Sequence, residues 1–247
     1  MPNAVQAFYR DNPHMVSSPF GGVHDWNDAL MREVFADLDI VVEGCMVLDV
    51  GCGRGFAREA IQSAGGHYHG VDFVLSAGGF PLAQADAARQ PFPDDTFDLL
   101  MCIDAFEHFP EPLAALREFR RVVKPGGIFF LSAPNYGNVA GVVKRWCERF
   151  GKYERDTWAP FGRWQAQELE QALTAGTVTR WARDAGFAQS CRIGYGYEVG
   201  LGLFPWLDHP RMPDRVRFRA QRLFRRIGPP IARIWPSASL HVFYRFE

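Results

Sequence analysis

The sequence predicts an α/β fold, with a mostly parallel sheet covered by helices on both faces. Between residues 46 and 134, short apolar runs alternate with segments whose apolar residues recur at helical spacing. This alternation is typical of parallel strands joined by helices. A final run at 239–246 alternates apolar and polar residues and predicts the last of seven strands.

The expected strands are 46–51, 67–72, 81–86, 97–104, 128–134, 188–194 and 239–246. The expected helices are 25–39, 54–64, 111–123 and 177–186. Asp25 is the expected N-cap of the first helix. The third helix is expected to end at Lys124-Pro125-Gly126-Gly127, because proline and glycine stop helices.

We expect a single domain over residues 1–247, with two inserts. The expected parts are an N-terminal cap and helix at 1–44, a core at 45–134, an insert at 135–176, a core helix and strand at 177–194, a second insert at 195–236 and the last strand at 237–247. Both inserts follow strands, so they emerge at the carboxyl edge, where open α/β sheets bind ligands. They are rich in aromatic residues, which favours a lid over a bulky apolar ligand; packing onto the core is the alternative.

Composition excludes several classes of protein. Hydrophobic residues make up 47% and charged residues 22%, which argues against a disordered chain. A net charge of −1 argues against a globally basic nucleic-acid binder. The five cysteines form no C-x-x-C pair, which argues against a disulfide framework or structural zinc. With no signal-peptide pattern and no long apolar window, we expect a cytoplasmic protein.

The strongest motif is a glycine-rich turn directly after the first strand. Val47-Leu48-Asp49-Val50 runs into Gly51-Cys52-Gly53-Arg54-Gly55, which lets backbone approach a ligand closely. A dinucleotide fingerprint would need a third glycine at position 56, which is Phe56. Asp49 would repel a pyrophosphate and suits an ammonium or a sulfonium.

With these motifs, the sequence resembles the class I S-adenosylmethionine (SAM) dependent methyltransferases, in the UbiE/type-11 small-molecule branch. LDVGCGRG resembles the first motif of that family, and GVDF (70–73) ends its second strand in an acid. QADAARQPFPDDTFDLL (84–100) and VVKPGGIFFLSAP (122–134) resemble later segments. The resemblance implies a Rossmann-like class I methyltransferase fold with SAM as cofactor, S-adenosylhomocysteine as product and no metal.

The resemblance also implies which residues contact the cofactor. They are Asp49, Gly51, Gly53, Asp72, Phe73, Asp86, Ala87 and Asp104. The glycines and Asp104 would lie against the methionine part, with Asp49 orienting the loop and facing the cationic end. Asp72 would accept from the ribose hydroxyls, Phe73 would pack near adenine, and Asp86 beside Ala87 would accept from its amino group. Ordinary turn, cap or strand-end roles are the alternative for each acid.

One departure from the family lies between the ribose and adenine residues. Thirteen residues separate Asp72 from Asp86, and the family usually places a full helix there. The segment VLSAGGF leaves room for a turn. The resemblance at the ribose and adenine residues is therefore weaker than at the glycine loop.

Methyl transfer requires few catalytic side chains. Positioning of donor and acceptor supplies much of the catalysis, and a hydroxyl acceptor needs a base within reach. His108, after the fourth strand, is the candidate base; a role in shaping the loop is the alternative. Tyr136 and Trp158 are the candidate residues that contact the acceptor, with packing as the alternative.

Residues 211–233 carry eight arginines against one acid, Asp214. As a helix they would place Val216, Ala220, Leu223, Phe224 and Ile227 on one stripe. Such a basic amphipathic helix suits peripheral contact with an anionic membrane, and a solvated face that pairs with acids elsewhere is the alternative.

The expected function is SAM-dependent methylation of a small molecule, aromatic or lipid-like, with O-methylation favoured over C- or N-methylation. The segment Ile103-Asp104-Ala105-Phe106 lacks the Asn/Asp-Pro-Pro-aromatic motif of base-amino methyltransferases, which argues against DNA as a partner. Two alternatives remain open. One is an RNA or protein methyltransferase that uses the arginine-rich segment, and the other is a non-catalytic SAM-binding regulatory domain.

Overall fold

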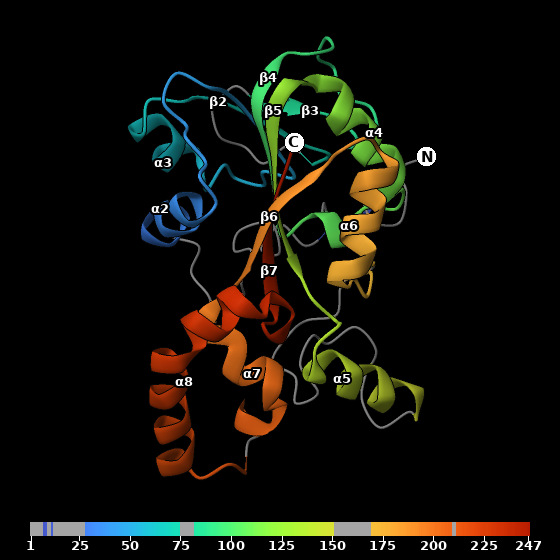
Figure 1. Cartoon of the computed structure of the whole chain (residues 1–247). Helices are drawn as coiled ribbons and strands as arrows, with labels where there is room; N and C mark the ends of the chain where they lie inside the picture. The colour runs from blue at the N-terminus through green and yellow to red at the C-terminus, as the bar shows by residue number, and fades with distance from the viewer. Residues whose placement is uncertain (1–6, 9–10, 12–27, 75–81, 151–168, 209–210) are drawn as a thin grey trace. The chain divides into compact units, whose positions relative to one another are not determined.

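The structure is a computed structural model that describes residues 7–8, 11, 28–74, 82–150, 169–208 and 211–247. A sheet in the order β3-β2-β1-β4-β5-β7-β6 runs through it (Figure 1). The strands are β1 Met46–Val50, β2 His67–Asp72, β3 Leu82–Gln84, β4 Phe97–Ile103, β5 Val123–Pro134, β6 Gln189–Gly194 and β7 His241–Phe246. From β3 to β5 every neighbouring pair is parallel, which confirms the predicted sheet.

Helices connect the strands. They are α2 Asp28–Asp37, α3 Arg58–Ser63, α4 Pro112–Val122, α5 Val139–Arg149, α6 Ala175–Asp184, α7 Val199–Leu203 and α8 Asp214–Ile234, with short 3-10 turns η1 Phe106–His108, η2 Gly196–Glu198, η3 Pro205–Asp208 and η4 Pro236–Ala238. In Figure 1, α3 and α4 lie on opposite sides of the strands. The expected N-cap Asp25 lies outside the described residues.

The chain divides into two compact units. Unit 1 comprises Met1–Ser132, Thr179–Cys191 and Tyr244–Glu247. Unit 2 comprises Ala133–Val178 and Arg192–Phe243, which are the two inserts of the sequence analysis with short flanking stretches. None of the helices in the described part of the chain has both the length and the apolar character that crossing a membrane requires.

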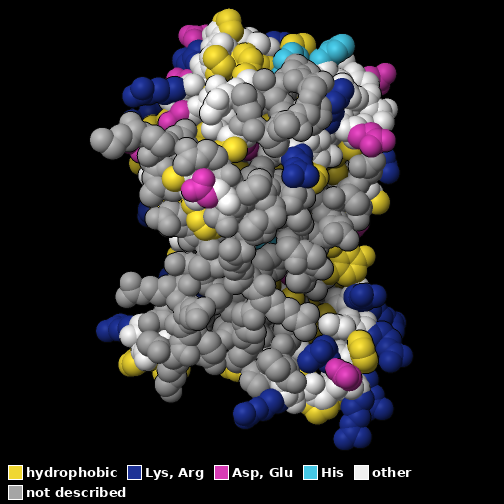
Figure 2. Space-filling view, turned by 180° about the vertical axis from the view of Figure 1, so that it is seen from behind, with side chains coloured by type: hydrophobic (Ala, Val, Ile, Leu, Met, Phe, Trp, Pro, Cys, Tyr) yellow, Lys and Arg dark blue, Asp and Glu magenta, His cyan; other side chains and the backbone are white. Residues whose placement is uncertain are grey.

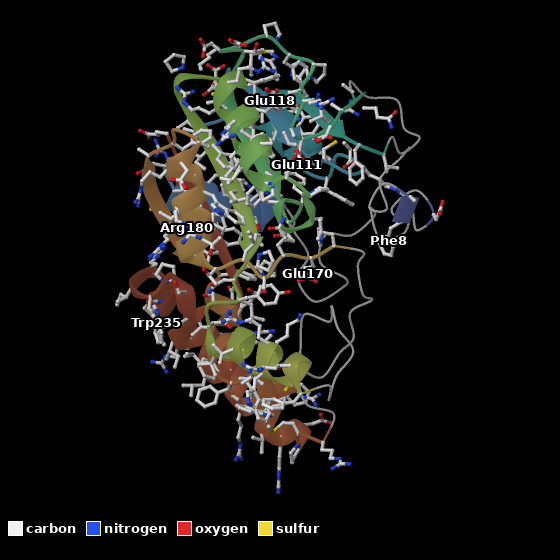
Figure 3. All side chains as sticks on the ribbon, turned by 90° about the vertical axis from the view of Figure 1, so that its right-hand side faces the viewer. Phe8, Glu111, Glu118, Glu170, Arg180 and Trp235 are labelled. Atoms are coloured by element: carbon white, nitrogen blue, oxygen red, sulfur yellow. The ribbon has the colours of Figure 1, made fainter. Side chains whose placement is uncertain are left out.

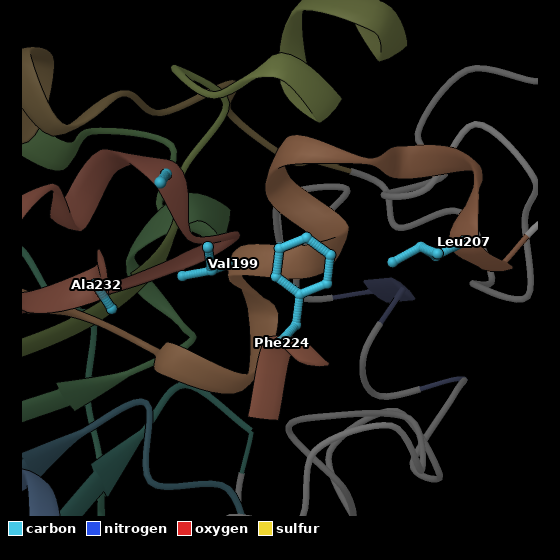
Figure 4. Close-up of a cluster of buried hydrophobic side chains, with 5 residues drawn as sticks. Val199, Leu207, Phe224 and Ala232 are labelled. Carbon is cyan, nitrogen blue, oxygen red and sulfur yellow. The ribbon is translucent and has the colours of Figure 1, made fainter. Parts of the chain in front are cut away.

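Each unit has its own core. In unit 1, β1 and β4 are almost wholly buried, as their mostly apolar sequence predicts for strands covered on both faces. Phe129 packs against Phe119, Phe187 and Phe246 there, at ring-centroid distances of 5.2–5.6 Å. In unit 2, Val199, Leu207, Phe224, Ala232 and Ala238 form a buried cluster (Figure 4). Burial of these apolar side chains is the main force that holds each unit together.

Two local expectations need correction. Helix α4 does end at Val122, but Lys124-Pro125-Gly126-Gly127 lies inside β5 instead of in a loop before it. The register between β4 and β5 shifts there: Phe97 pairs with Val123, but Leu99 pairs with Ile128. The extra residues of β5 between these two pairs form a β-bulge.

The predicted stripe on the arginine-rich helix is also partly wrong. Helix α8 forms, and it continues through Pro229 and Pro230 to its end. Phe224 is buried as expected, but Val216 and Leu223 are 45% and 52% exposed. At about 100° per residue these two side chains lie far enough around the helix from Phe224 to miss the core.

Candidate cofactor site

The glycine loop begins where β1 ends, in the middle of the sheet. Strands β2 and β3 extend the sheet on one side of β1, and β4 and β5 extend it on the other. Open α/β sheets bind ligands beside the carboxyl ends of strands at such a reversal of strand order. Gly51, Gly53 and Gly55 have φ angles of +76°, +54° and +74°, a region that favours glycine. The three glycines therefore fit the backbone of this loop.

The loop is held in place from two sides. The N–H groups of Gly51 and Cys52 donate to the carbonyl oxygen of Val71, at 2.9 and 3.2 Å. On the other side, a Cβ at Gly51 would lie 2.5 Å from the Cβ of Ala105, which follows β4. The close contact and the positive φ both require glycine at this position.

Asp72, the last residue of β2, also holds the loop. The Gly53 N–H donates to its Oδ2 at 2.9 Å, and the Val74 N–H donates to its Oδ1 at 3.1 Å. Each carboxylate oxygen can accept about two hydrogen bonds, so the carboxylate keeps acceptor capacity beyond these two N–H groups. Burial raises the pKa of Asp72, and the backbone N–H groups oppose that shift.

Asp49 lies beneath the loop and is 4% exposed. Its Oδ2 accepts a hydrogen bond from the Tyr68 hydroxyl at 2.7 Å. Burial raises the pKa of Asp49 to about 7; the Tyr68 hydrogen bond opposes this shift, and the charge of Asp72 adds to it. Two carboxyl groups beside one loop favour a ligand with positive charge, since a cation stabilises their ionised forms. The donor set therefore fits SAM, which carries both a sulfonium and an ammonium.

The segment after β3 brings Asp86 to the same edge of the sheet. Asp72 and Gln84 are paired in register, so Asp86 lies two residues beyond the paired position. Asp86 is exposed, its Oδ1 accepts from the Ala88 N–H at 2.9 Å, and Ala87 lies in the turn that follows. The half-buried Phe73 lies after β2, and its carbonyl oxygen accepts from the side chain of Gln84. Most of the shortened connection, at 75–81, lies outside the described residues.

The loop after β4 carries the remaining unit 1 candidates. Asp104 has a φ of +45°, which is uncommon for a residue other than glycine. Its Oδ1 accepts from the Ser132 hydroxyl at 2.6 Å. His108 ends η1, and its Nε2 lies 3.7 Å from Oε1 of the buried Glu107. Both candidates thus follow the strand that lies beside the glycine loop.

The two acceptor-side candidates belong to unit 2 by sequence. Tyr136 is 1% exposed, and its hydroxyl donates to the carboxylate of Glu170, which Figure 3 labels. The ammonium of Lys144 lies 5.1 Å from the centroid of the Tyr136 ring. Trp158 lies outside the described residues. The acceptor roles of both residues stay predictions.

Sequence reasoning missed two residues that the structure adds to this edge. Tyr68 could have been found from the register, because Gly70 pairs with Asp49 and Tyr68 is two residues before Gly70 on the same face of β2. Ser132 could have been found similarly, since it pairs with Ile103, directly before Asp104. Both signals appear only once the strand pairing is known.

Comparison with known proteins agrees with this geometry. The family model described as a methyltransferase domain, of type 11, matches residues 48–131. A ubiquinone biosynthesis O-methyltransferase from Paraburkholderia xenovorans is 33% identical over 153 residues, which cover 54% of this chain and 63% of that protein. One from Stutzerimonas stutzeri is 29% identical over 73% of this chain and 79% of that protein. The first match thus spans less than two thirds of its relative.

Solved structures share the fold at low sequence identity. A SAM-dependent methyltransferase from Mesorhizobium loti has a TM-score of 0.55 at 15% identity, with 87% of this chain and 95% of that chain covered. One from Archaeoglobus fulgidus has a TM-score of 0.56 at 16% identity, covering 89% and 94%. The fold is the Rossmann-like class I methyltransferase fold. Residues 48–131 thus match the type-11 methyltransferase domain family, and the relatives and solved structures that this chain resembles are named as methyltransferases.

Proposed function

We propose that this chain is an enzyme that transfers a methyl group from SAM to a hydroxyl of a small aromatic or lipid-like molecule. This proposal rests on the glycine loop at the strand-order reversal, with Asp49 and Asp72 beside it. Bound there, SAM would supply an electrophilic methyl group on its sulfonium. The rest of the proposal concerns what the residues of this chain do.

The loop residues bind and orient the cofactor. Asp72 keeps Gly53 in place and uses its remaining acceptor positions for the two ribose hydroxyls. Asp49, ionised once a cation is bound, faces the charged end of the cofactor. Asp86 accepts from the adenine amino group at the far end of the same edge. Fixing the donor in this way supplies the entropic part of catalysis, because transfer is an in-line displacement.

O-methylation of an aromatic acceptor is supported by the relatives and by the inserts. The curated relatives are named as ubiquinone biosynthesis O-methyltransferases. Removing a phenolic proton needs a base, and His108 follows β4 at the edge where the cofactor residues lie. Its ring would take the proton, and Glu107, 3.7 Å from Nε2, would stabilise the imidazolium.

The test uses purified chain, methyl-labelled SAM and extract of the source cells. Label is counted in the organic, aqueous small-molecule, protein and nucleic-acid fractions. Label in a small molecule, found on an aromatic oxygen by mass spectrometry, supports the proposal. Label in protein or RNA would show that the acceptor is a macromolecule instead of a small molecule. Cofactor binding with no label anywhere would favour the regulatory alternative.

Two variants separate binding from chemistry. Asp72→Ala should weaken S-adenosylhomocysteine binding at least about tenfold, because two buried N–H groups and the ribose lose an acceptor. Asp37→Ala, on an exposed face of α2, is the matched control and should bind normally. His108→Gln should keep cofactor binding and lower kcat by about 10²-fold or more. A His108→Gln variant with unchanged kcat and an unchanged pH profile would remove His108 from the mechanism.

A further inference from the structure

Charge is divided unevenly between the two units. Unit 2 contains fifteen lysines and arginines against eight acidic residues, a net charge of +7. Unit 1 contains twelve against twenty, a net charge of −8. The overall charge of −1 hides this division. A surface with negative charge would therefore attract unit 2 and repel unit 1.

Exposed apolar side chains, like positive charge, are concentrated in unit 2. Among the described residues, fourteen large hydrophobic side chains are exposed, and of these Val41 and Phe56 are the two that belong to unit 1. Five of the others lie on α8 or directly after it: Val216, Phe218, Leu223, Ile234 and Trp235. Unit 2 thus combines positive charge with exposed apolar surface.

One face of helix α8 packs into the unit 2 core. Phe224, Gly228 and Ala232 are buried, and Phe224 and Ala232 belong to the cluster drawn in Figure 4. Gly228 lies so close to Gly196 that a Cβ there would meet its carbonyl oxygen. Because this face is packed, the opposite face of α8 points away from the core.

The outward face alternates arginines with apolar side chains. Its exposed arginines are Arg215, Arg219, Arg222, Arg225, Arg226 and Arg233. Phe218, 60% exposed, lies three residues after Arg215 and four before Arg222. Leu223 lies four residues after Arg219 and three before Arg226. Residues three and four apart are neighbours on a helix surface, so each apolar side chain stands between two guanidinium groups.

We propose that the outward face of α8 docks on the surface of an anionic lipid bilayer. The arginines would bind headgroup phosphates, and Phe218, Leu223 and the end of the helix would enter the apolar boundary. Figure 2 shows dark-blue side chains gathered with yellow ones at the lower right, around α8, and Figure 3 labels Trp235 at the end of the helix. The exposed aliphatic residues Val216, Leu223 and Ile234 favour a bilayer over RNA, because RNA bases stack on aromatic rings and offer aliphatic side chains less apolar contact than a bilayer does.

This inference goes beyond the proposed function and does not depend on it. A bilayer contact through α8 would hold unit 2, which contains both aromatic inserts, where lipid-like acceptors are dissolved. The readout is binding of the full chain to vesicles, with no methyl transfer involved.

The experiment is co-sedimentation of the full chain with vesicles of phosphatidylcholine, with and without 30% phosphatidylglycerol. Binding is expected with phosphatidylglycerol only and should weaken between 0.05 and 0.5 M NaCl, because salt screens the arginines. Equal binding to both vesicles, or no binding to either, would overturn the proposal. Stronger binding to single-stranded RNA than to the anionic vesicles would also overturn it, in favour of RNA.

Two sets of variants localise the contact. Replacing Arg215, Arg222 and Arg226 by Gln should weaken vesicle binding roughly 100-fold, at about fivefold for each basic side chain. Leu223→Gln with Ile234→Gln should weaken it at least about tenfold by removing apolar contact.

The matched controls lie on unit 1. The exposed Arg32, Arg117 and Arg180, replaced by Gln, lower the net charge by the same amount. Val41→Gln removes an apolar side chain that is 70% exposed. Both controls should bind vesicles as the parent does. If they weaken binding as much as the α8 variants do, the contact is not on α8. An unchanged far-UV circular dichroism spectrum and an unchanged urea midpoint show that each variant is folded.

Discussion

Replacing Asp49 by Asn should stabilise the chain, and the gain should grow with pH. Asp49 is buried, and its pKa is raised from 3.8 to about 7. Between these two pH values the folded state holds a proton that the unfolded chain has released. The folded state therefore loses stability relative to the unfolded state as pH rises through this window. Asn has nearly the same shape and carries no charge at any pH, so the variant lacks this loss.

The size of the effect follows from the pKa shift. One pKa unit corresponds to about 1.4 kcal/mol. With folded and unfolded pKa values of about 7 and 3.8, the cost of Asp49 is about 1.5 kcal/mol at pH 5 and about 4 kcal/mol at pH 8. The stability difference between variant and parent should thus rise by about 2.5 kcal/mol from pH 5 to pH 8. The changed hydrogen bond with Tyr68 adds a constant that cancels in this comparison.

The assay is urea unfolding of both proteins at pH 5, 6, 7 and 8. Other titrating groups are shared by the two chains, so the difference between their unfolding free energies isolates Asp49. A difference that stays the same at all four pH values would refute the argument, because it would mean that Asp49 titrates alike in both states.

A cationic ligand should couple to the same carboxyl group. Binding of S-adenosylhomocysteine, which carries an ammonium, should tighten from pH 6 to pH 8 by up to about tenfold as Asp49 ionises. Methylthioadenosine lacks the ammonium and should show little change. Calorimetry at each pH measures both ligands, and the Asp49→Asn variant should lose the difference between them.

Four further substitutions test the fit of the glycine loop and a buried hydrogen-bonded pair. Gly51→Ala and Gly44→Ala both place a side chain at a φ above +70°, but only the first meets a neighbour, the Cβ of Ala105 at 2.5 Å. Gly44→Ala should cost about 1–2 kcal/mol of unfolding free energy and Gly51→Ala about 1–3 kcal/mol more, and equal losses in urea would contradict the close contact. Glu198 is buried, with both carboxylate oxygens 2.9 Å from Nδ1 of His241. Glu198→Ala should cost about 3–5 kcal/mol of unfolding free energy, since it removes the carboxylate that the buried histidine contacts. Glu198→Gln should cost less, because an acceptor remains. Similar thermal shifts for the two variants would argue against this.

The core of the fold could be predicted from the sequence because its signals are local. The run that forms β1 is apolar apart from Asp49 and is followed by glycine, and all but one of its residues are buried. The predicted strands at 67–72 and 97–104 match β2 and β4 to within one residue. The structure of the inserts was not predicted. Helix α5 nevertheless has apolar residues at helical spacing, which the sequence analysis did not use: Val139, Val142, Val143, Trp146 and Cys147.

For the candidate site, the sequence predicted positions better than contacts. Glycines with positive φ and acids at strand ends are visible as residue types, so Gly51 and Asp72 could be singled out. Which acid bonds to the loop depends on the register of β1 and β2, and that register is a property of the folded sheet. Asp72 accepts the hydrogen bond from the loop, at the Gly53 N–H, while Asp49 accepts one from the Tyr68 hydroxyl.

Helix α8 shows why periodicity alone could not assign its faces. Apolar residues occur on more than one side of this helix, so a stripe can be drawn through Val216 and Leu223 as well as through Phe224. Only contact with the rest of unit 2 decides between them, and the core takes Phe224. A helix that leaves Leu223 52% exposed between arginines gives up apolar burial that folding alone would have gained. The vesicle experiment asks whether a bilayer supplies that burial.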